Sequence, residues 1–221
     1  MLLRKALIFF MDFIYPPCCL ICGKINKNNL CEECERLIYS KAKFKKSIKL
    51  KRKIYFKKQI YIFKYEDVVR KLIIDYKFRD KSHLYKLFSE IIIKNKKICR
   101  NLKSYDIIIP VPIHHKRKKE RGFNQSELIA KYLATKLDSI KLENKVIIKK
   151  INNKKQSKLK KSERIENVKN VYEIINKEKI VNKRIILFDD IYTTGNTVNE
   201  ISKLLKENGA KEIIVLTIAK D

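Results

Sequence analysis

The stretch ILFDDIYTTGNT, residues 186–197, places two adjacent carboxylates and a hydroxyl-rich loop directly after an apolar run. The apolar run predicts a buried strand that ends at Asp189 and Asp190. Apolar spacing over residues 198–207 predicts a helix immediately after the loop. In open α/β sheets, ligands bind beyond the carboxyl ends of the strands, and a helix N-terminus attracts anions. The stretch therefore predicts a phosphate site whose two carboxylates face sugar hydroxyls or a divalent cation.

The predicted helix also carries a start signal. Thr197 and Glu200 have the spacing of a capping box, in which the threonine hydroxyl accepts a hydrogen bond from the first turn and the glutamate reaches back. This pattern predicts that Thr197 caps the helix.

Strand-like and helix-like segments alternate outside this stretch, from about residue 60 onward. Runs typical of strands lie at 60–65, 106–112, 145–150, 171–175, 184–190 and 212–219. Helical apolar spacing lies at 66–76, 84–99, 123–137 and 198–207. Interleaving of this kind predicts an α/β fold with a mostly parallel sheet flanked by helices.

Four cysteines near the N-terminus form two CxxC pairs, Cys19 with Cys22 and Cys31 with Cys34. Each pair can chelate a metal through a tight turn, and four thiolates suit a structural Zn²⁺ ion in tetrahedral geometry. An iron–sulfur cluster is the less favoured alternative. Cys18 is a second possible ligand in place of Cys19, although the spacing favours Cys19. Because such a closed site has no open position, we expect it to support folding rather than chemistry.

The charge of the chain is strongly positive. Its 221 residues carry 53 Lys and Arg against 24 Asp and Glu, a formal net charge of +29. That balance is typical of proteins with a polyanionic partner, including nucleic acid. However, 43 of the basic residues are lysine, so A/T-rich codon usage is an alternative explanation. Residues 41–58 hold ten basic residues and no acid, and Phe44, Tyr55 and Phe56 between them could stack single-stranded bases.

Several classes of protein are excluded by composition. No apolar run reaches the roughly 18–20 residues of a membrane span, so we expect no stable membrane insertion. The start ALIFFMDFIYPP resembles a secretion signal, but Asp12 interrupts it and Tyr15-Pro16-Pro17 replaces the cleavage site. We expect an amphipathic helix there and a cytoplasmic protein with reduced cysteines. The chain has no GxxxxGK[ST] or GxGxxG motif, which leaves P-loop hydrolysis and Rossmann-type binding without support.

The stretch 186–197 resembles the phosphoribosyl-pyrophosphate-binding signature of type I phosphoribosyltransferases. Two further segments narrow the resemblance to the ComF/GntX family of amidophosphoribosyltransferase-like proteins. These are IIPVPIHHKRKKERGFNQSELIAKYLA (108–134) and FIYPPCCLICG (13–23), the latter followed by the second CxxC pair. The three motifs occur in order, and the resemblance covers nearly the whole chain. The resemblance implies a type I phosphoribosyltransferase fold with a small N-terminal zinc finger of four cysteines.

The resemblance also implies the roles of particular residues. Asp189 and Asp190 are expected to bind the ribose 2′ and 3′ hydroxyls, with Mg²⁺ accompanying phosphoribosyl pyrophosphate. The segment 154–168 resembles the mobile catalytic loop of such enzymes and contributes Arg164. The residues expected at the 5′-phosphate are Thr193, Thr194, Gly195, Asn196 and Thr197. Those expected at pyrophosphate are Lys116, Arg117, Lys118, Lys119 and Arg121.

Two features of the sequence limit the enzymatic activities that we expect. Amidophosphoribosyltransferases carry an N-terminal cysteine nucleophile for glutamine hydrolysis, whereas residue 2 here is Leu, so we expect no glutaminase activity. His114 and His115 follow the 106–112 strand, and we interpret them as part of a solvated basic turn rather than as ligands of the leaving group.

These observations predict three parts: an N-terminal helix and four-cysteine zinc finger (1–40), a basic linker or strand (41–60), and a phosphoribosyltransferase domain (61–221). The resemblance implies, as the favoured function, a phosphoribosyltransferase with an unknown acceptor and a role in DNA uptake during natural transformation. One alternative is a single-stranded-DNA-binding competence factor whose transferase site is regulatory or inactive, working with competence-machinery proteins. Another is a non-catalytic zinc-stabilised adaptor.

Overall fold

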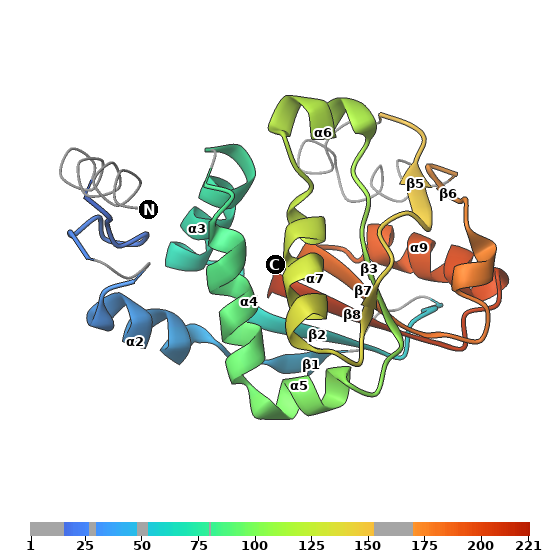
Figure 1. Cartoon of the computed structure of the whole chain (residues 1–221), viewed down its shortest axis with the longest axis horizontal. Coiled ribbons are helices and arrows are strands. Elements are labelled where there is room, and N and C mark those ends of the chain that lie inside the picture. The colour runs from blue at the N-terminus through green and yellow to red at the C-terminus, as the bar shows by residue number, and fades with distance from the viewer. Residues whose placement is uncertain (1–15, 27–29, 48–52, 80, 153–169) are drawn as a thin grey trace, which may run out of the picture.

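The computed structural model describes residues 16–26, 30–47, 53–79, 81–152 and 170–221. Its centre is a six-stranded sheet in the order β1-β2-β8-β7-β3-β4, and β5 and β6 form a separate antiparallel ribbon (Figure 1). Among the described strands of the large sheet, only β1 and β2 pair in the antiparallel sense. The strands are β1 (Lys45–Ser47), β2 (Lys58–Lys64), β3 (Ile107–Pro110), β4 (Lys141–Leu142), β5 (Ile147–Lys149), β6 (Tyr172–Ile174), β7 (Arg184–Tyr192) and β8 (Glu212–Lys220).

Helices cover both faces of the large sheet. The side chains of Ile186 and Phe188 pack with helices α3, α4 and α7 on one face, whereas Ile185 and Leu187 pack with α9 on the other. This alternation explains why β7 reads as a continuous apolar run, since both of its faces are buried. The helices are α2 (Glu32–Lys41), α3 (Asp67–Phe78), α4 (Leu84–Lys94), α5 (Lys96–Leu102), α6 (His115–Arg121), α7 (Gln125–Lys136) and α9 (Asn196–Glu207), with a short 3₁₀ turn η2 (Lys177–Lys179). The predicted α/β fold with a mostly parallel sheet is confirmed.

The segment 84–99, predicted as one helix, is two. The chain turns at Asn95, whose extended backbone ends α4 and whose side-chain oxygen accepts a hydrogen bond from the Ile98 amide (2.9 Å) at the start of α5. An asparagine that caps the second helix in this way favours a break over a continuous helix. The prediction of a single helix was therefore wrong at Asn95.

The described parts of the run 41–58 contribute to the large sheet, since β1 lies within it and β2 begins at its last residue. β1 pairs with β2, and β2 lies between β1 and β8. Phe56 is buried against the α9 side of the sheet, and Phe44 packs partly against the opposite core. The expectation that Phe56 could stack on nucleic-acid bases is therefore wrong, because its ring is taken up by packing.

Within the parts of the chain that the structure describes, no helix has both the length and the apolar character needed to cross a membrane.

Candidate functional site

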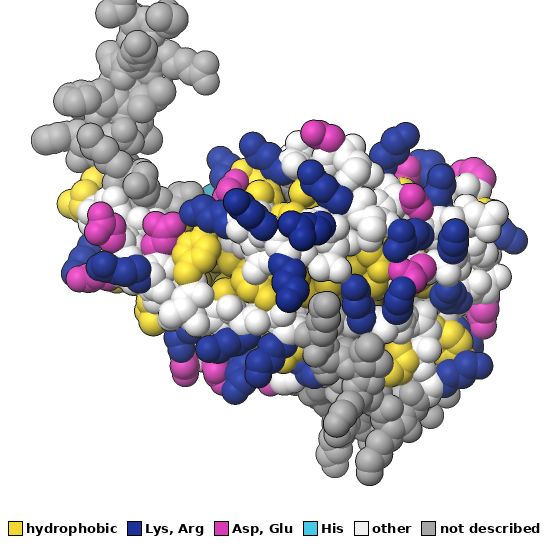
Figure 2. Space-filling view, turned by 90° about the horizontal axis from the view of Figure 1, so that it is seen from below, with side chains coloured by type: hydrophobic (Ala, Val, Ile, Leu, Met, Phe, Trp, Pro, Cys, Tyr) yellow, Lys and Arg dark blue, Asp and Glu magenta, His cyan; other side chains and the backbone are white. Residues whose placement is uncertain are grey.

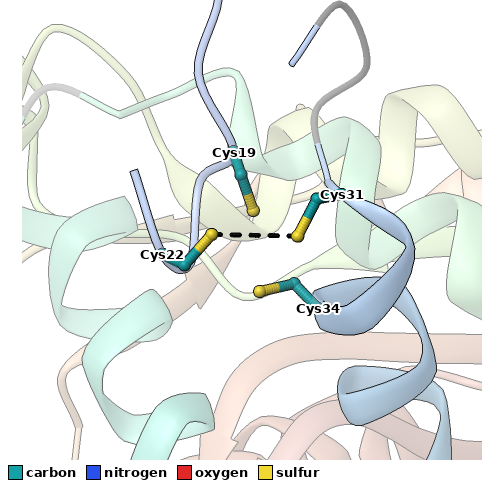
Figure 3. A group of neighbouring side chains, drawn as sticks. All are labelled: Cys19, Cys22, Cys31 and Cys34. Atoms are coloured by element: carbon teal, nitrogen blue, oxygen red, sulfur yellow. Dashed lines mark hydrogen bonds between the residues drawn. The ribbon is translucent and has the colours of Figure 1, made fainter. Parts of the chain in front are cut away.

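The four cysteines of the CxxC pairs converge at one point (Figure 3). Their sulfur atoms all lie within 4.8 Å of one another, and the Sγ atoms of Cys22 and Cys31 are 3.8 Å apart. A Zn²⁺ ion held about 2.3 Å from four thiolates in tetrahedral geometry would space the sulfurs about 3.8 Å apart. The donor set and its spacing therefore fit a tetrahedral metal ion. Cys18 lies outside this cluster, with its Sγ directed at the Pro16 carbonyl oxygen (3.1 Å), so Cys19 is the fourth member.

Local backbone geometry builds this cluster from the sequence. Cys19 and Cys22 flank a tight turn in which the Gly23 amide donates to the Cys19 carbonyl (2.9 Å), and Gly23 has a left-handed φ of +77°. Cys31 occupies the N-cap of α2, and Cys34 lies in its first turn. A turn thus presents one pair and a helix start presents the other.

The cluster is packed onto the body of the protein. Cys34 and Ile38 of α2 are buried and belong to the same apolar cluster as α3 and α4. Lys94 at the end of α4 pairs with Glu35 (3.1 Å) and lies over the ring of Tyr39 (4.9 Å). The cysteine cluster and the sheet therefore share one core.

The acidic pair lies near the carboxyl end of β7, as predicted. Asp189 accepts hydrogen bonds from the Asp190 amide (2.9 Å) and from the Ser126 hydroxyl (3.3 Å) on α7. Asp190 forms an ion pair with Lys77 of α3 (2.8 Å), and both side chains are mostly buried. Burial and the adjacent Asp190 charge raise the pKa of Asp189 to about 7, and Lys77 opposes the rise. Elements far apart in sequence thus hold the two carboxylates in place.

The loop after β7 leads directly into α9. Gly195 has a left-handed φ of +72° and occupies the N-cap, and its carbonyl accepts from the Asn199 amide (2.9 Å). A Cβ at Gly195 would lie 2.2 Å from the Tyr192 hydroxyl, so any other residue there would force the Tyr192 ring or the loop to shift. The helix begins at Asn196, and the prediction that Thr197 caps it was wrong. Thr197 instead lies inside the first turn and hydrogen-bonds to Tyr172.

The basic segment after β3 forms α6, a helix whose every residue is at least partly exposed. Arg121, at its end, donates to Gln125 (2.7 Å) and stacks over Phe78 (5.0 Å). Its pKa is lowered by burial, while the charge of Asp190 opposes that shift, which places the guanidinium within electrostatic reach of the acidic pair. Lys116 is exposed at the start of the helix, and its amide donates to the His114 ring (3.3 Å). α6 therefore brings at least one predicted cation, Arg121, close to the acidic pair.

The two histidines differ from the predicted solvated turn. His114 is only 4% exposed and accepts a hydrogen bond at the N-cap of α6, whereas His115 is exposed and lies against it with ring centroids 4.1 Å apart. Burial and the neighbouring His115 charge lower the pKa of His114. The interpretation as a solvated turn was wrong for His114, because this ring caps a helix.

Sequence reasoning missed several residues beside the acidic pair. Lys77, Ser126, Lys149 and Tyr172 all come from elements distant from 186–197 in the chain. Ser126 lies within the motif at 108–134 but was given no role there, and the other three lie outside the quoted motifs. One signal was available for Lys149. Successive side chains of a strand point to opposite faces, so the predicted strand 145–150 directs either Lys149 or Lys150 inward. Arg164 and the rest of the 154–168 segment lie outside the described residues, as does the predicted N-terminal helix.

Comparison with known proteins identifies the family of this chain. The pattern of the phosphoribosyl transferase domain family matches residues 124–221, which include β7, the loop and α9. Competence protein F of Haemophilus influenzae is 34% identical over 154 residues, covering 67% of this chain and 66% of that protein. Competence protein ComFC of Bacillus subtilis is 28% identical over 193 residues, 86% of this chain and 72% of that protein. The chain belongs to the ComF family.

The resemblance predicted from three motifs is thereby confirmed, and this ComF-family chain has a type I phosphoribosyltransferase fold. The alignment spans slightly less than two thirds of the length of the Haemophilus protein. Among solved structures, purine phosphoribosyltransferase from Pyrococcus horikoshii has 16% identity and a TM-score of 0.41, covering 74% of this chain and 88% of that one.

Proposed function

We propose that this ComF-family protein binds phosphoribosyl pyrophosphate at the carboxyl edge of β7 and acts as a phosphoribosyltransferase. One observation carries the proposal: two mostly buried carboxylates lie beside a glycine-initiated helix N-terminus, within the segment that matches the phosphoribosyl transferase domain. A helix start of this kind offers free amides to a phosphate, and carboxylates accept hydrogen bonds from sugar hydroxyls. The acceptor of the phosphoribosyl group is left unassigned.

The proposed roles follow the chemistry of each group. Asp189 and Asp190 hold the ribose hydroxyls, and residues 193–197 hold the 5′-phosphate. Lys116, Arg117 and Arg121, with Arg164 from the segment outside the described residues, neutralise the pyrophosphate as negative charge develops on it. Carboxylate and phosphate oxygens are the ligands Mg²⁺ prefers, and the ion would supply further neutralisation of the leaving group.

An Asp189→Asn/Asp190→Asn variant tests this assignment. We expect affinity for phosphoribosyl pyrophosphate to fall about tenfold or more, because each amide loses the negative charge that strengthens a hydrogen bond to a sugar hydroxyl. The measurement is calorimetric titration with phosphoribosyl pyrophosphate and Mg²⁺. Asp138→Asn, on the exposed surface, is the matched control and should bind like the wild type. Equal binding by the double variant would refute the site.

We further propose that the cysteine cluster holds a structural Zn²⁺ ion, supported by the sulfur spacing, and that the protein resides in the cytoplasm. All four thiols are free of disulfides, and a reducing compartment keeps such thiols available to a metal.

A second candidate function is binding of single-stranded DNA during DNA uptake, together with competence proteins. It is supported by the names of relatives, which include DNA utilization protein YhgH of Escherichia coli at 28% identity, and by the +29 charge. Figure 2 shows Lys and Arg side chains spread across one face with acidic side chains between them. The charge on that face is therefore distributed rather than gathered in one patch.

A salt series tests the DNA proposal. We expect log affinity for a single-stranded oligonucleotide to fall with log salt with a slope of about −0.7 for each phosphate contacted. A Lys45→Glu/Lys53→Glu variant should reduce both affinity and slope, because these exposed lysines belong to the 41–58 run. Lys97→Glu/Lys131→Glu, exposed on α5 and α7, changes net charge equally and serves as the control. Identical losses in both variants, or a flat salt response, would contradict binding by that run.

A further inference from the structure

The β5–β6 ribbon presents two adjacent lysines to opposite faces. Lys149 pairs in register with Tyr172, and the Lys150 amide donates to the Val171 carbonyl (2.8 Å). Lys150 is exposed and forms an ion pair with Glu173 (3.1 Å). Lys149 is partly buried, with its Nζ 5.7 Å from the centroid of the Tyr172 ring. One lysine of the pair therefore belongs to the surface and the other faces inward.

Lys149 lies between the α6 cations and the first turn of α9, the two groups proposed to bind phosphate. Tyr172, beneath it, is buried and hydrogen-bonds to Thr197 in the first turn of α9. Burial and the positive charge of Arg117 lower the pKa of Lys149 to about 8, and the negative charge of Asp189 opposes that shift. Lys149 thus lies within electrostatic reach of an α6 cation and of the acidic pair, beside the residues expected to hold a 5′-phosphate.

Packing alone does not explain a lysine in this position. Taking an ammonium group partly out of water next to another cation is unfavourable, and an apolar residue would pack on Tyr172 without that penalty. Asp189 already accepts hydrogen bonds from Ser126 and from the Asp190 amide. A bound polyanion would make the position of Lys149 favourable, because its negative charge would attract both Lys149 and Arg117.

We propose that Lys149 is a further anion-binding residue of this site, contacting a phosphate oxygen of a phosphorylated sugar between the α6 cations and the α9 N-terminus. Tyr172 is the positioning residue, since it fixes the ribbon to Thr197. This inference rests on the proposed function and adds to it a contribution from the ribbon that no sequence motif marks.

The test compares Lys149→Met with Lys150→Met, a neighbouring lysine with the opposite orientation. Calorimetry with phosphoribosyl pyrophosphate and Mg²⁺ should show affinity reduced about tenfold or more for Lys149→Met, because a charge-assisted contact is lost. Lys150→Met should stay within about twofold of the wild type, because its partner is Glu173 on the surface. Lys149→Arg should recover most of the affinity. The melting temperature of Lys149→Met should not fall, since the variant keeps the apolar stem and removes a desolvated charge.

The other possible outcomes either support or overturn the role of Lys149. Equal affinities of Lys149→Met and wild type would overturn it, and so would a loss matched by Lys150→Met. If Lys149→Met fails to fold, Lys149→Gln is judged by the same affinity criterion. Inorganic pyrophosphate separates this inference from the proposed function. If the wild type binds pyrophosphate but not phosphoribosyl pyrophosphate, the proposed function is refuted. If Lys149→Met then fails to bind pyrophosphate, the assignment of Lys149 as an anion-binding residue is supported. Binding of neither probe by the wild type would overturn both.

Discussion

An alanine in place of Gly195 is expected to lower the free energy of unfolding by about 2–5 kcal/mol and to reduce affinity for phosphoribosyl pyrophosphate about a hundredfold. Two causes act together. A left-handed φ of +72° is unfavourable for any residue with a Cβ, and that Cβ would lie 2.2 Å from the Tyr192 hydroxyl. Either the Tyr192 ring or the loop must move. Because the loop leads into the first turn of α9, its displacement misplaces the amides proposed to hold phosphate.

Gly122→Ala is the matched control for stability. Gly122 has a similar φ of +78°, but an added Cβ there meets nothing within 4 Å. Its loss of stability should therefore reflect backbone strain alone, and the difference between the variants measures the clash. Adding Tyr192→Ala to Gly195→Ala should restore binding in part by removing the clashing ring. Urea unfolding and calorimetric titration supply both readouts. If Gly195→Ala matches Gly122→Ala in stability and the wild type in affinity, the close approach of Tyr192 has no consequence.

Replacing Cys22 by serine is expected to remove the metal and to lower the free energy of unfolding by about 5 kcal/mol or more, because structural zinc contributes directly to folding. Cys22 is exposed, so little apolar burial is lost with it. Any large effect must therefore come from the lost metal ligand. Elemental analysis and thermal unfolding of the purified protein measure the two changes.

Cys18→Ser is the control for the metal prediction, since Cys18 is equally a surface thiol but lies outside the cluster. It should keep one metal ion per chain and the wild-type melting temperature. Equal metal content in Cys22→Ser and Cys18→Ser would contradict the assignment. Iron with acid-labile sulfide, in place of zinc, would favour the iron–sulfur alternative.

Those parts of the fold with a strong local signal were predictable from sequence. β7 and β8 are buried on both faces and therefore appear as uninterrupted apolar runs. β7 nevertheless extends two residues beyond Asp190, because its ladder with β8 continues to Tyr192 opposite Lys220. α6 was not predicted as a helix, since a helix without a buried face carries no apolar periodicity.

The candidate site also contains residues that a local sequence signal marks and residues that it does not. Asp189, Asp190 and Gly195 lie in one continuous stretch, and their juxtaposition follows from a strand, a loop and a helix in succession. Lys77 pairs with Asp190 only through the tertiary packing of α3, and the β5–β6 ribbon brings Lys149 within electrostatic reach of Asp189. The boundaries at residues 40 and 60 remain predictions.

The place of β8 in the sheet sets the order in which the protein can assemble during synthesis. β8 lies between β2 and β7, yet it is made after every other strand of the large sheet. Until residues 212–220 have left the ribosome, the pair β1–β2 cannot join the strands β7, β3 and β4, because β8 pairs with both groups. The four cysteines proposed to hold Zn²⁺ are complete by residue 34, long before that point. We therefore expect the cysteine segment to acquire its proposed ion on the nascent chain, while the carboxyl edge of the sheet is completed only after β8 has been translated.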